Sequence, residues 1–217
     1  MKMLVVYQKL GSHRFLGHLD LQRAMQRALR RSGLPVCYSQ GFNPHLLLSF
    51  AAPLPVGIQG EREIMELPLG EPVTENDFLR RLNAALPEGL KTLQARLLSD
   101  DTAPAMARLE AAVYTIVPRE EAPGLLAAVP GFMAQTSIPY LKKTKSAERM
   151  DDLRPLIYNL LVKQGALHAV LAINERGTAR PDQLLVSLAA FAGVASPRCA
   201  VTRAALLDGR MAPLENL

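Results

Sequence analysis

Apolar side chains recur at helical spacing in residues 18–32, and this pattern is the clearest one in the chain. The repeated positions are Leu21, Met25, Ala28 and Leu29. Such a stripe predicts a helix with one buried face. Gly33 is suited to the position after the last helical turn, and Pro35 cannot continue the helix.

The rest of the first hundred residues reads as strands around a second helix. Apolar or alternating segments predict strands at residues 2–9, 36–38, 46–50, 61–69 and 90–98. Thr74 begins the second helix, with Asp77 three residues later as in a capping box. The order strand, helix, strand, strand, helix, strand is that of the ferredoxin-like fold. A doubly wound parallel sheet needs a helix at residues 51–60, which are too rich in proline and glycine.

The second half roughly repeats this order after a linker at residues 99–108. We expect strands or extended segments at residues 109–117, 138–142, 153–161, 167–173 and 199–207, and helices at 120–129 and 181–191. The predicted fold is therefore α+β, with two tandem ferredoxin-like (βαββαβ) domains built on antiparallel sheets. Their predicted bounds are 1–98 and 109–217.

Composition indicates a folded globular protein without a cofactor. The chain of 217 residues is 49% hydrophobic and 21% charged. Cys37 and Cys199 are far apart, which argues against a zinc ribbon or an iron–sulfur cluster. Residues 122–141 lack charge, but three prolines interrupt them, so we expect no membrane span. Without a signal peptide at its start, the chain is expected to be cytoplasmic.

Positive charge is concentrated at the start of the chain. Residues 1–50 have a net charge of +6, whereas the whole chain is +5. Four arginines follow the helical spacing of residues 18–32 on a face away from the apolar stripe: Arg23, Arg27, Arg30 and Arg31. Arginine pairs with phosphate in a planar, bidentate geometry, so the stripe suggests a polyanionic partner. The alternative is an ordinary solvated helix face.

The segment after this helix, residues 38–45, combines aromatic and hydrogen-bonding side chains. Tyr38 and Phe42 are candidates for stacking on a base, and Gln40, Asn43 and His45 for contacts with its edges. The alternative is a rigid loop between strands in which Phe42 fills the core. Phe42 taken alone favours that alternative, because a single aromatic residue is more often buried.

Other candidate chemistry is sparse. The histidines have no metal-ligand spacing, so we predict no metal site, although His18 or His45 remain candidates for acid–base chemistry. No phosphate-binding glycine loop or serine-hydrolase motif is present. Arg154 and Arg180 each precede a proline. The second of these is explained as a helix start, with Arg180 near the N-cap. The lysines at 142, 143 and 145 are expected to be solvated.

Several of these motifs resemble a bacterial radical-SAM-linked family of unknown function. The resemblance rests on segments 15–20, 23–35, 38–45, 153–156 and 177–182. It implies a domain that occurs alone or fused C-terminally to a cobalamin-binding radical SAM protein. The loop departs from the family pattern at Leu46 and Leu47, where proline and a basic residue are common. The chain itself lacks the three clustered cysteines of a radical SAM enzyme.

We therefore expect a non-catalytic module that binds an RNA related to tRNA or rRNA and presents this RNA to a radical SAM protein. An endoribonuclease of the ferredoxin-like RNA-processing type and a protein–protein adaptor without RNA remain alternatives. The predicted RNA contacts are Arg14, His18, Arg23, Arg27, Arg30, Arg31, Tyr38, Gln40, Phe42, Asn43, His45, Arg154 and Arg180. The oligomeric state and the identity of the RNA are open at this point.

Overall fold

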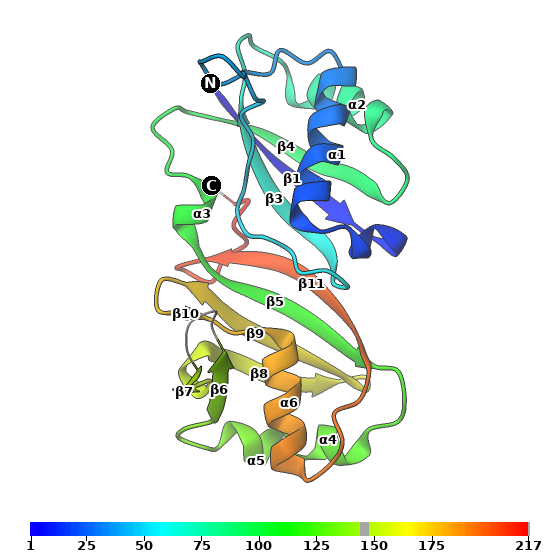
Figure 1. The fold of residues 1–217 in the computed structure, drawn as a ribbon, viewed down its shortest axis with the longest axis vertical. Coiled ribbons are helices and arrows are strands. Elements are labelled where there is room, and N and C mark those ends of the chain that lie inside the picture. The colour runs from blue at the N-terminus through cyan, green and yellow to red at the C-terminus, as the bar shows by residue number, and fades with distance from the viewer. Residues whose placement is uncertain (144–147, 217) are drawn as a thin grey trace. The chain divides into compact units, whose positions relative to one another are not determined.

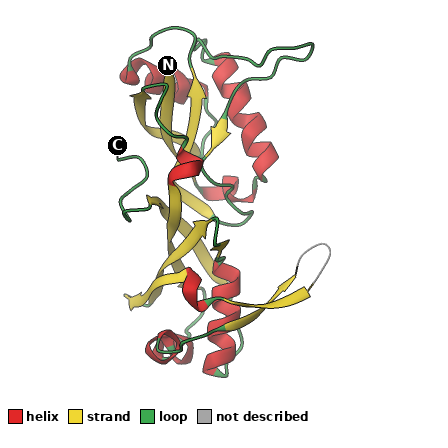
Figure 2. Cartoon of the chain, turned by 90° about the vertical axis from the view of Figure 1, so that its left-hand side faces the viewer, coloured by secondary structure: helices red, strands yellow, loops and turns green. Residues whose placement is uncertain are grey.

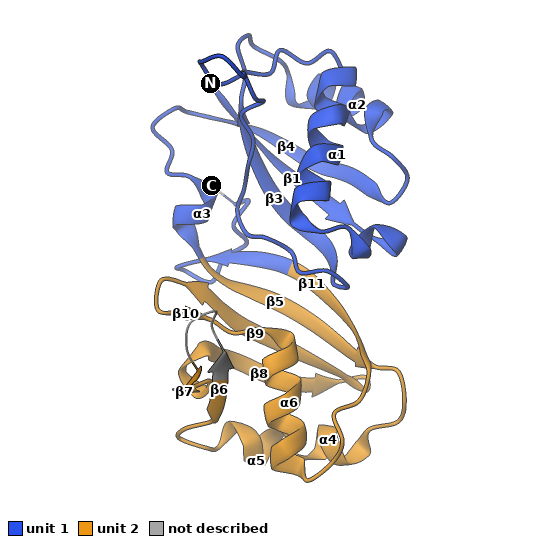
Figure 3. Ribbon diagram, in the orientation of Figure 1, with its two compact units in different colours: residues 1–109, 205–217 blue, residues 110–204 orange. Residues whose placement is uncertain are grey.

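The computed structural model describes residues 1–143 and 148–216, which divide into two compact units. Unit 1 consists of residues 1–109 together with 205–217, and unit 2 of residues 110–204 (Figure 3). The end of the chain thus returns to the unit that contains its start. Lys145 and the side chains of Lys142 and Lys143 lie outside the described residues.

Unit 1 is a β-sheet with two long helices. Its elements in chain order are β1 (Lys2–Lys9), α1 (His18–Arg31), β2 (Ser49–Phe50), β3 (Gln59–Pro68), α2 (Glu75–Ala85), β4 (Leu90–Leu98) and the short α3 (Ala105–Arg108) (Figure 1). A 3-10 turn, Gly11–Phe15, precedes α1. Strand β1 pairs antiparallel with both β3 and β4, and β2 pairs antiparallel with β3.

Alternation along β1 decides which face of this sheet the helices cover. Met3, Val5 and Tyr7 share one hydrophobic core with the buried stripe of α1 and with Phe78 and Leu82 of α2. Because side chains alternate along a strand, Leu4 and Val6 face the opposite side. They are also buried, at 1% and 0% exposure. Both faces of the sheet are therefore covered, and α1 and α2 lie on the same face.

The connection from α1 to β3 holds less strand than its apolar residues predict. Only Ser49 and Phe50 form β2, while Val36 and Tyr38 make isolated bridges to Leu69 and Leu46. Gly33 has a φ of +63°, which turns the chain at the end of α1. Short bridges and side-chain hydrogen bonds thus take the place of a regular ladder, leaving residues 38–45 as a loop.

Unit 2 contains most of the remaining elements. They are β5 (Leu109–Pro118), α4 (Pro123–Ala127), α5 (Val129–Met133), β6 (Pro139–Lys143), β7 (Glu148–Asp152), β8 (Ile157–Lys163), β9 (Ala166–Asn174), β10 (Gly177–Thr178), α6 (Pro181–Ala192) and β11 (Cys199–Asp208). Its strand order is β10-β9-β5-β11, with β8 beside β9, and β6 pairs with β7 as a separate hairpin. Strand β11 begins in unit 2 and ends in unit 1.

The chain thus has a mixed α/β fold with mostly antiparallel strands and few helices. The tandem ferredoxin-like arrangement stays a prediction. The helix expected at residues 120–129 is instead two short helices, and Pro130 stands at the start of the second. Of the β6–β7 hairpin, the sequence predicts β6 as an extended segment at residues 138–142 but not β7, because β7 has no alternation of apolar residues. No helix in the described part of the chain is long and apolar enough to cross a membrane.

A polar cluster in unit 2 joins residues from separate strands. Glu110 Oε1 accepts hydrogen bonds from the Tyr158 hydroxyl, at 2.5 Å, and from Asn174 Nδ2, at 2.8 Å. Arg176 forms an ion pair with the same oxygen at 2.7 Å. The hydrogen bond from Tyr158, followed by the contacts of Arg176, lowers the pKa of Glu110. The ionised carboxylate is therefore the form that the folded chain stabilises.

We predict that Glu110→Gln lowers the free energy of unfolding at pH 7 by about 1 kcal/mol, the scale of a typical intramolecular hydrogen bond. The stability from a lowered carboxyl pKa is present above the unfolded value, 4.5, and is lost as the pH falls through the folded value. Denaturant titrations should therefore show the difference between wild type and variant shrinking as the pH falls below 4.5. Glu175→Gln, an exposed control, should change little at either pH. A difference that stays constant with pH would contradict this account.

Candidate nucleic-acid interface

The outward face of α1 carries three arginines, which we call the arginine face: Arg23, Arg27 and Arg30. All three are exposed, whereas Leu21, Met25, Ala28 and Leu29 are buried. At 100° per residue, the arginine face lies opposite the buried stripe on the helix. Packing of α1 on the sheet therefore directs these guanidinium groups to solvent.

Little protein charge opposes the arginine face. Arg23 forms an ion pair with Asp20 at 3.3 Å, but both side chains are at least 60% exposed. Such surface pairs contribute little and open readily. Among the described residues, Arg27 and Arg30 have no hydrogen-bond or ion-pair partner. The guanidinium groups of Arg27 and Arg30 are thus available to an anion. Arg23 can bind one by giving up its solvent-exposed ion pair with Asp20.

Two other predicted arginines near α1 have structural contacts. Arg31 donates to the carbonyl of Ala85 at 2.6 Å, so it binds the C-terminal end of α2. Arg14 donates to the carbonyl of Gly11 at 2.8 Å, and its guanidinium lies 4.4 Å from the ring centre of Phe15. These contacts hold both side chains in place. They leave Arg31 exposed and Arg14 half-buried.

The aromatic loop, residues 38–45, is closed by contacts between its two ends. Ser39 N donates to the carbonyl of His45 at 2.8 Å, and His45 N donates to Ser39 Oγ at 3.0 Å. Ser39 Oγ also lies 2.7 Å from His45 Nδ1. At the tip, Gly41 has a φ of +121°, which only glycine adopts readily. The loop is therefore a pinned turn with a defined tip.

The tip of the aromatic loop projects its side chains into solvent. Phe42 is fully exposed, and Tyr38 is 40% exposed. Gln40 and Asn43 are exposed and have no hydrogen-bond partner in the described part of the chain. The alternative in which Phe42 fills the core is wrong, and the predicted contact of Phe42 with RNA stays a prediction. Leu46 and Phe50 supply the buried apolar groups of this segment instead.

The arginine face and the aromatic loop both belong to unit 1. In Figure 2, the loop between α1 and the next strand extends to the upper right, away from the C-terminal end of α1. Figure 1 shows the same loop at the end of unit 1 that the C-terminal end of α1 reaches. Unit 1 thus carries exposed cationic groups along α1 and exposed aromatic groups on the loop that follows it.

His18 connects this region to the core. It is the first residue of α1, and its ring packs edge-to-face on Phe50 with 5.3 Å between ring centres. Phe50 in turn packs edge-to-face on Tyr7. His18 is therefore half-buried and helps to hold β2 against the start of α1.

Arg154 and Arg180 lie in unit 2. Arg154 donates to the carbonyls of Gln135 and Ile157, at 3.2 and 3.1 Å. Asp152 Oδ1 accepts from the backbone N–H groups of Ile138 and Arg154, and the bond from Ile138 is the main cause of its lowered pKa. Arg180 is the N-cap of α6, as predicted, and its guanidinium pairs with Asp182 at 2.9 Å. Both motifs thus have structural contacts of their own.

One exposed aromatic side chain was missed from the sequence. Phe15 is 61% exposed beside Arg14, directly before α1, and Leu19 in the first turn is 63% exposed. The signal in the sequence was the pair Arg14-Phe15, which lies in a segment too short to bury the ring of Phe15. No described group of three or more His, Cys, Asp or Glu side chains is placed to hold a metal ion.

Comparison with known proteins gives a family but no function. The sequence model of a family described as an uncharacterized protein conserved in bacteria (DUF2344) matches residues 2–181. This stretch contains α1, the aromatic loop and the start of α6. No curated protein matches the chain.

The exposure of Phe42 predicts a stability result. Phe42→Ala should change the free energy of unfolding by less than about 0.5 kcal/mol, as for a surface substitution. Phe50→Ala, which removes a side chain 6% exposed, should cost about 3–5 kcal/mol. Urea denaturation of both variants measures the difference. A loss of several kcal/mol from Phe42→Ala would show that the ring is part of the core.

Proposed function

The chain belongs to the bacterial family of uncharacterized proteins DUF2344, and we propose that it is a non-catalytic RNA-binding module. The observation that carries the proposal is that one unit contains both an exposed arginine face and an exposed aromatic loop. Both lie within residues 1–50, which have a net charge of +6, whereas the whole chain is +5.

The arginine face suits a chain of phosphates. Arg23 and Arg30 are seven residues apart, about 10 Å along the helix axis, and Arg27 lies between them. Each guanidinium can donate two parallel hydrogen bonds to one phosphate. A row of such groups fits several phosphates in succession better than a single small anion. The expected partner is therefore a nucleic-acid strand.

The aromatic loop suits unpaired bases. Phe42 and Tyr38 offer exposed ring faces for stacking, which is typical of single-stranded RNA recognition. The amides of Gln40 and Asn43 are free to hydrogen-bond base edges. Because the Ser39–His45 contacts fix the ends of the loop, little conformational entropy is lost on binding.

The arrangement of unit 1 supports a platform role. Its strand order, β4-β1-β3 with β2 beside β3 and both long helices on one face, is that expected for a ferredoxin-like domain. We extend the same interpretation to unit 2, as the second of two tandem domains. This fold is a common RNA scaffold, although the analogy by itself carries no function.

We propose that the module presents RNA, tRNA or rRNA related, to a radical SAM protein in the cytoplasm. The proposal of this partner rests on the resemblance of the motifs. Cys37 is in unit 1 and Cys199 in unit 2, and both are free thiols, so the partner would supply the cluster. For the endoribonuclease alternative the site offers less support. His18 packs on Phe50, and His45 closes the loop through Ser39.

We predict that replacing Arg23, Arg27 and Arg30 together by Ala greatly weakens binding of a single-stranded RNA oligonucleotide. Each phosphate contact contributes about 0.7 to the slope of log K against log salt concentration, so the slope should fall by about 2. Fluorescence anisotropy at several salt concentrations measures both effects. Because all three side chains are exposed, the melting temperature should stay close to that of wild type.

A matched control removes the same charge elsewhere. Arg119, Arg198 and Arg210 are also exposed, and their replacement by Ala should leave the salt slope nearly unchanged. Equal losses in the two triple variants would show that net charge alone, and no localised surface, causes the binding.

The adaptor alternative is tested with the same variants. If the module only docks a radical SAM protein, a pull-down with that protein is unaffected by loss of the arginine face, and wild type shows no RNA binding. Under our proposal, wild type binds RNA and the triple Arg23, Arg27, Arg30 variant does not.

A further inference from the structure

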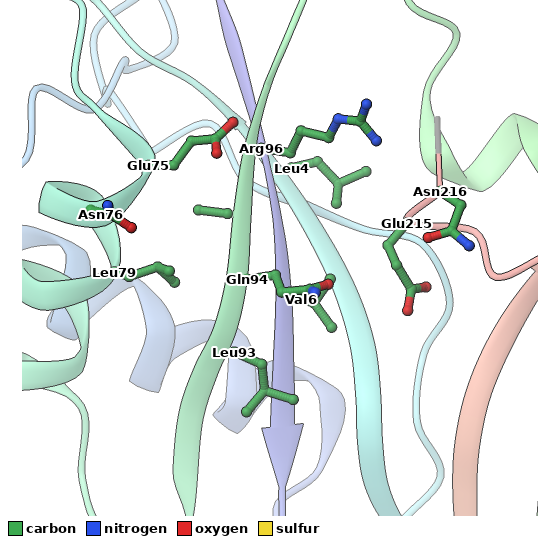
Figure 4. Close-up of a pocket in the computed structure, with 11 residues that line it drawn as sticks. Leu4, Val6, Glu75, Asn76, Leu79, Leu93, Gln94, Arg96, Glu215 and Asn216 are labelled. Atoms are coloured by element: carbon green, nitrogen blue, oxygen red, sulfur yellow. The ribbon is translucent and has the colours of Figure 1, made fainter.

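Unit 1 contains a cavity of about 360 Å³ at the β4 edge of its sheet. Leu4 and Val6 of β1 and Leu93 of β4 form apolar walls, and Gln94, Arg96 and Glu215 contribute polar groups (Figure 4). Leu4 and Val6 face away from the core that α1 covers. The cavity is therefore separate from the arginine face, and its volume is that of a small-molecule site.

A buried carboxylate lines this cavity. The side chain of Glu215 is only 6% exposed, and its Oε1 accepts from Arg62 Nε at 2.6 Å. Its Oε2 is also buried, and no described residue donates a hydrogen bond to it. A buried acceptor without a donor is costly, so native structures rarely keep one without a ligand or a role.

Arg62 defines what else faces the cavity. Arg62 Nη2 donates to Gln94 Oε1 at 2.8 Å. The oxygen of Gln94 is thus occupied, and its amide nitrogen remains as a donor. Figure 4 shows the Gln94 amide extending from β4 toward the side on which Glu215 of the C-terminal segment lies. The cavity accordingly offers one acceptor and one donor, both fixed by the same guanidinium.

These groups select the chemistry of a ligand. Oε2 accepts from an N–H or O–H donor, and because Arg62 already balances the charge of Glu215, a neutral donor such as an amino group suits it better than an ammonium. Arg96 is exposed, and among the described residues its guanidinium has no partner. Its planar fork fits a phosphate. Apolar walls between these two groups fit a flat heterocycle.

We propose that this cavity binds a nucleotide whose base carries an exocyclic amino group. The amino group donates to Glu215 Oε2, and the phosphate pairs with Arg96. This site does not depend on the arginine face, so either proposal can fail alone. A free nucleotide and the end nucleotide of an RNA share this chemistry. To distinguish these two ligands, the affinity of the chain for CMP is compared with its affinity for a short oligonucleotide that ends in C, and the ligand that binds more tightly is the source.

The test compares CMP with UMP on the full chain by isothermal titration calorimetry. The two differ where cytosine has an amino group and uracil a carbonyl, so CMP should bind about tenfold more tightly. Glu215→Gln should reverse this preference. Arg62 requires an oxygen at the Oε1 position, which places the amide nitrogen of the new Gln at Oε2 as a donor.

Further variants separate the site from the RNA surface and from a folding defect. Arg96→Ala, at an exposed position, should weaken CMP binding while leaving cytidine binding unchanged. Arg27→Ala should leave CMP binding unchanged while weakening RNA binding. The proposal is overturned if CMP does not bind, if CMP and UMP bind equally, or if folded Glu215→Gln keeps the wild-type preference. Should Glu215→Gln not fold, the Arg96→Ala variant decides: the proposal is overturned if this variant binds CMP as tightly as wild type does, or if it loses cytidine binding to the same extent as CMP binding.

Discussion

The packing of α1 on the β1 and β3 face is the constraint on which the proposed surface depends. Leu21, Met25, Ala28 and Leu29 are at most 2% exposed, and burying them fixes the rotation of the helix about its axis. Burial of four apolar side chains is worth several kcal/mol, far more than any repulsion among exposed arginines at physiological salt. The guanidinium groups therefore have no alternative to the solvent side. The same core fixes Phe50, and through it the start of α1.

Local patterns made part of this arrangement predictable. Strand β1 and strand β4 have the expected bounds, and α1 ends one residue earlier than predicted. Helical spacing also placed the arginines opposite the buried stripe. These features depend on side chains that are neighbours in one element, so periodicity is enough to identify them.

Features that depend on packing beyond a single helix or strand were not predictable. The exposure of Phe42 follows from Leu46 and Phe50 filling the adjacent core, which no local pattern distinguishes from Phe42 doing so. Arg31 looked equivalent to Arg30 on the helix, but it reaches the carbonyl of Ala85, 54 residues later. Glu215 belongs to the unit that contains β1, and its contact with Arg62 spans 153 residues. Sequence reasoning had no signal for that cavity.

The two arginine motifs of unit 2 show how a shared appearance can hide different roles. Arg154 is held by two carbonyls beside the Asp152 turn, whereas Arg180 begins a helix and pairs with Asp182. The arginine face differs from both, because its surroundings supply few partners. An arginine that the fold leaves without partners is the better candidate for an external ligand than one that the fold has engaged.

The central claim is that the arginine face and the aromatic loop act as one surface. It is tested most directly by NMR chemical-shift mapping of an isotope-labelled chain titrated with single-stranded RNA. The account predicts that shift changes cluster at residues 23–30 and 38–45 and saturate together, with one apparent dissociation constant. Changes in only one of the two segments, or changes confined to unit 2, would contradict it.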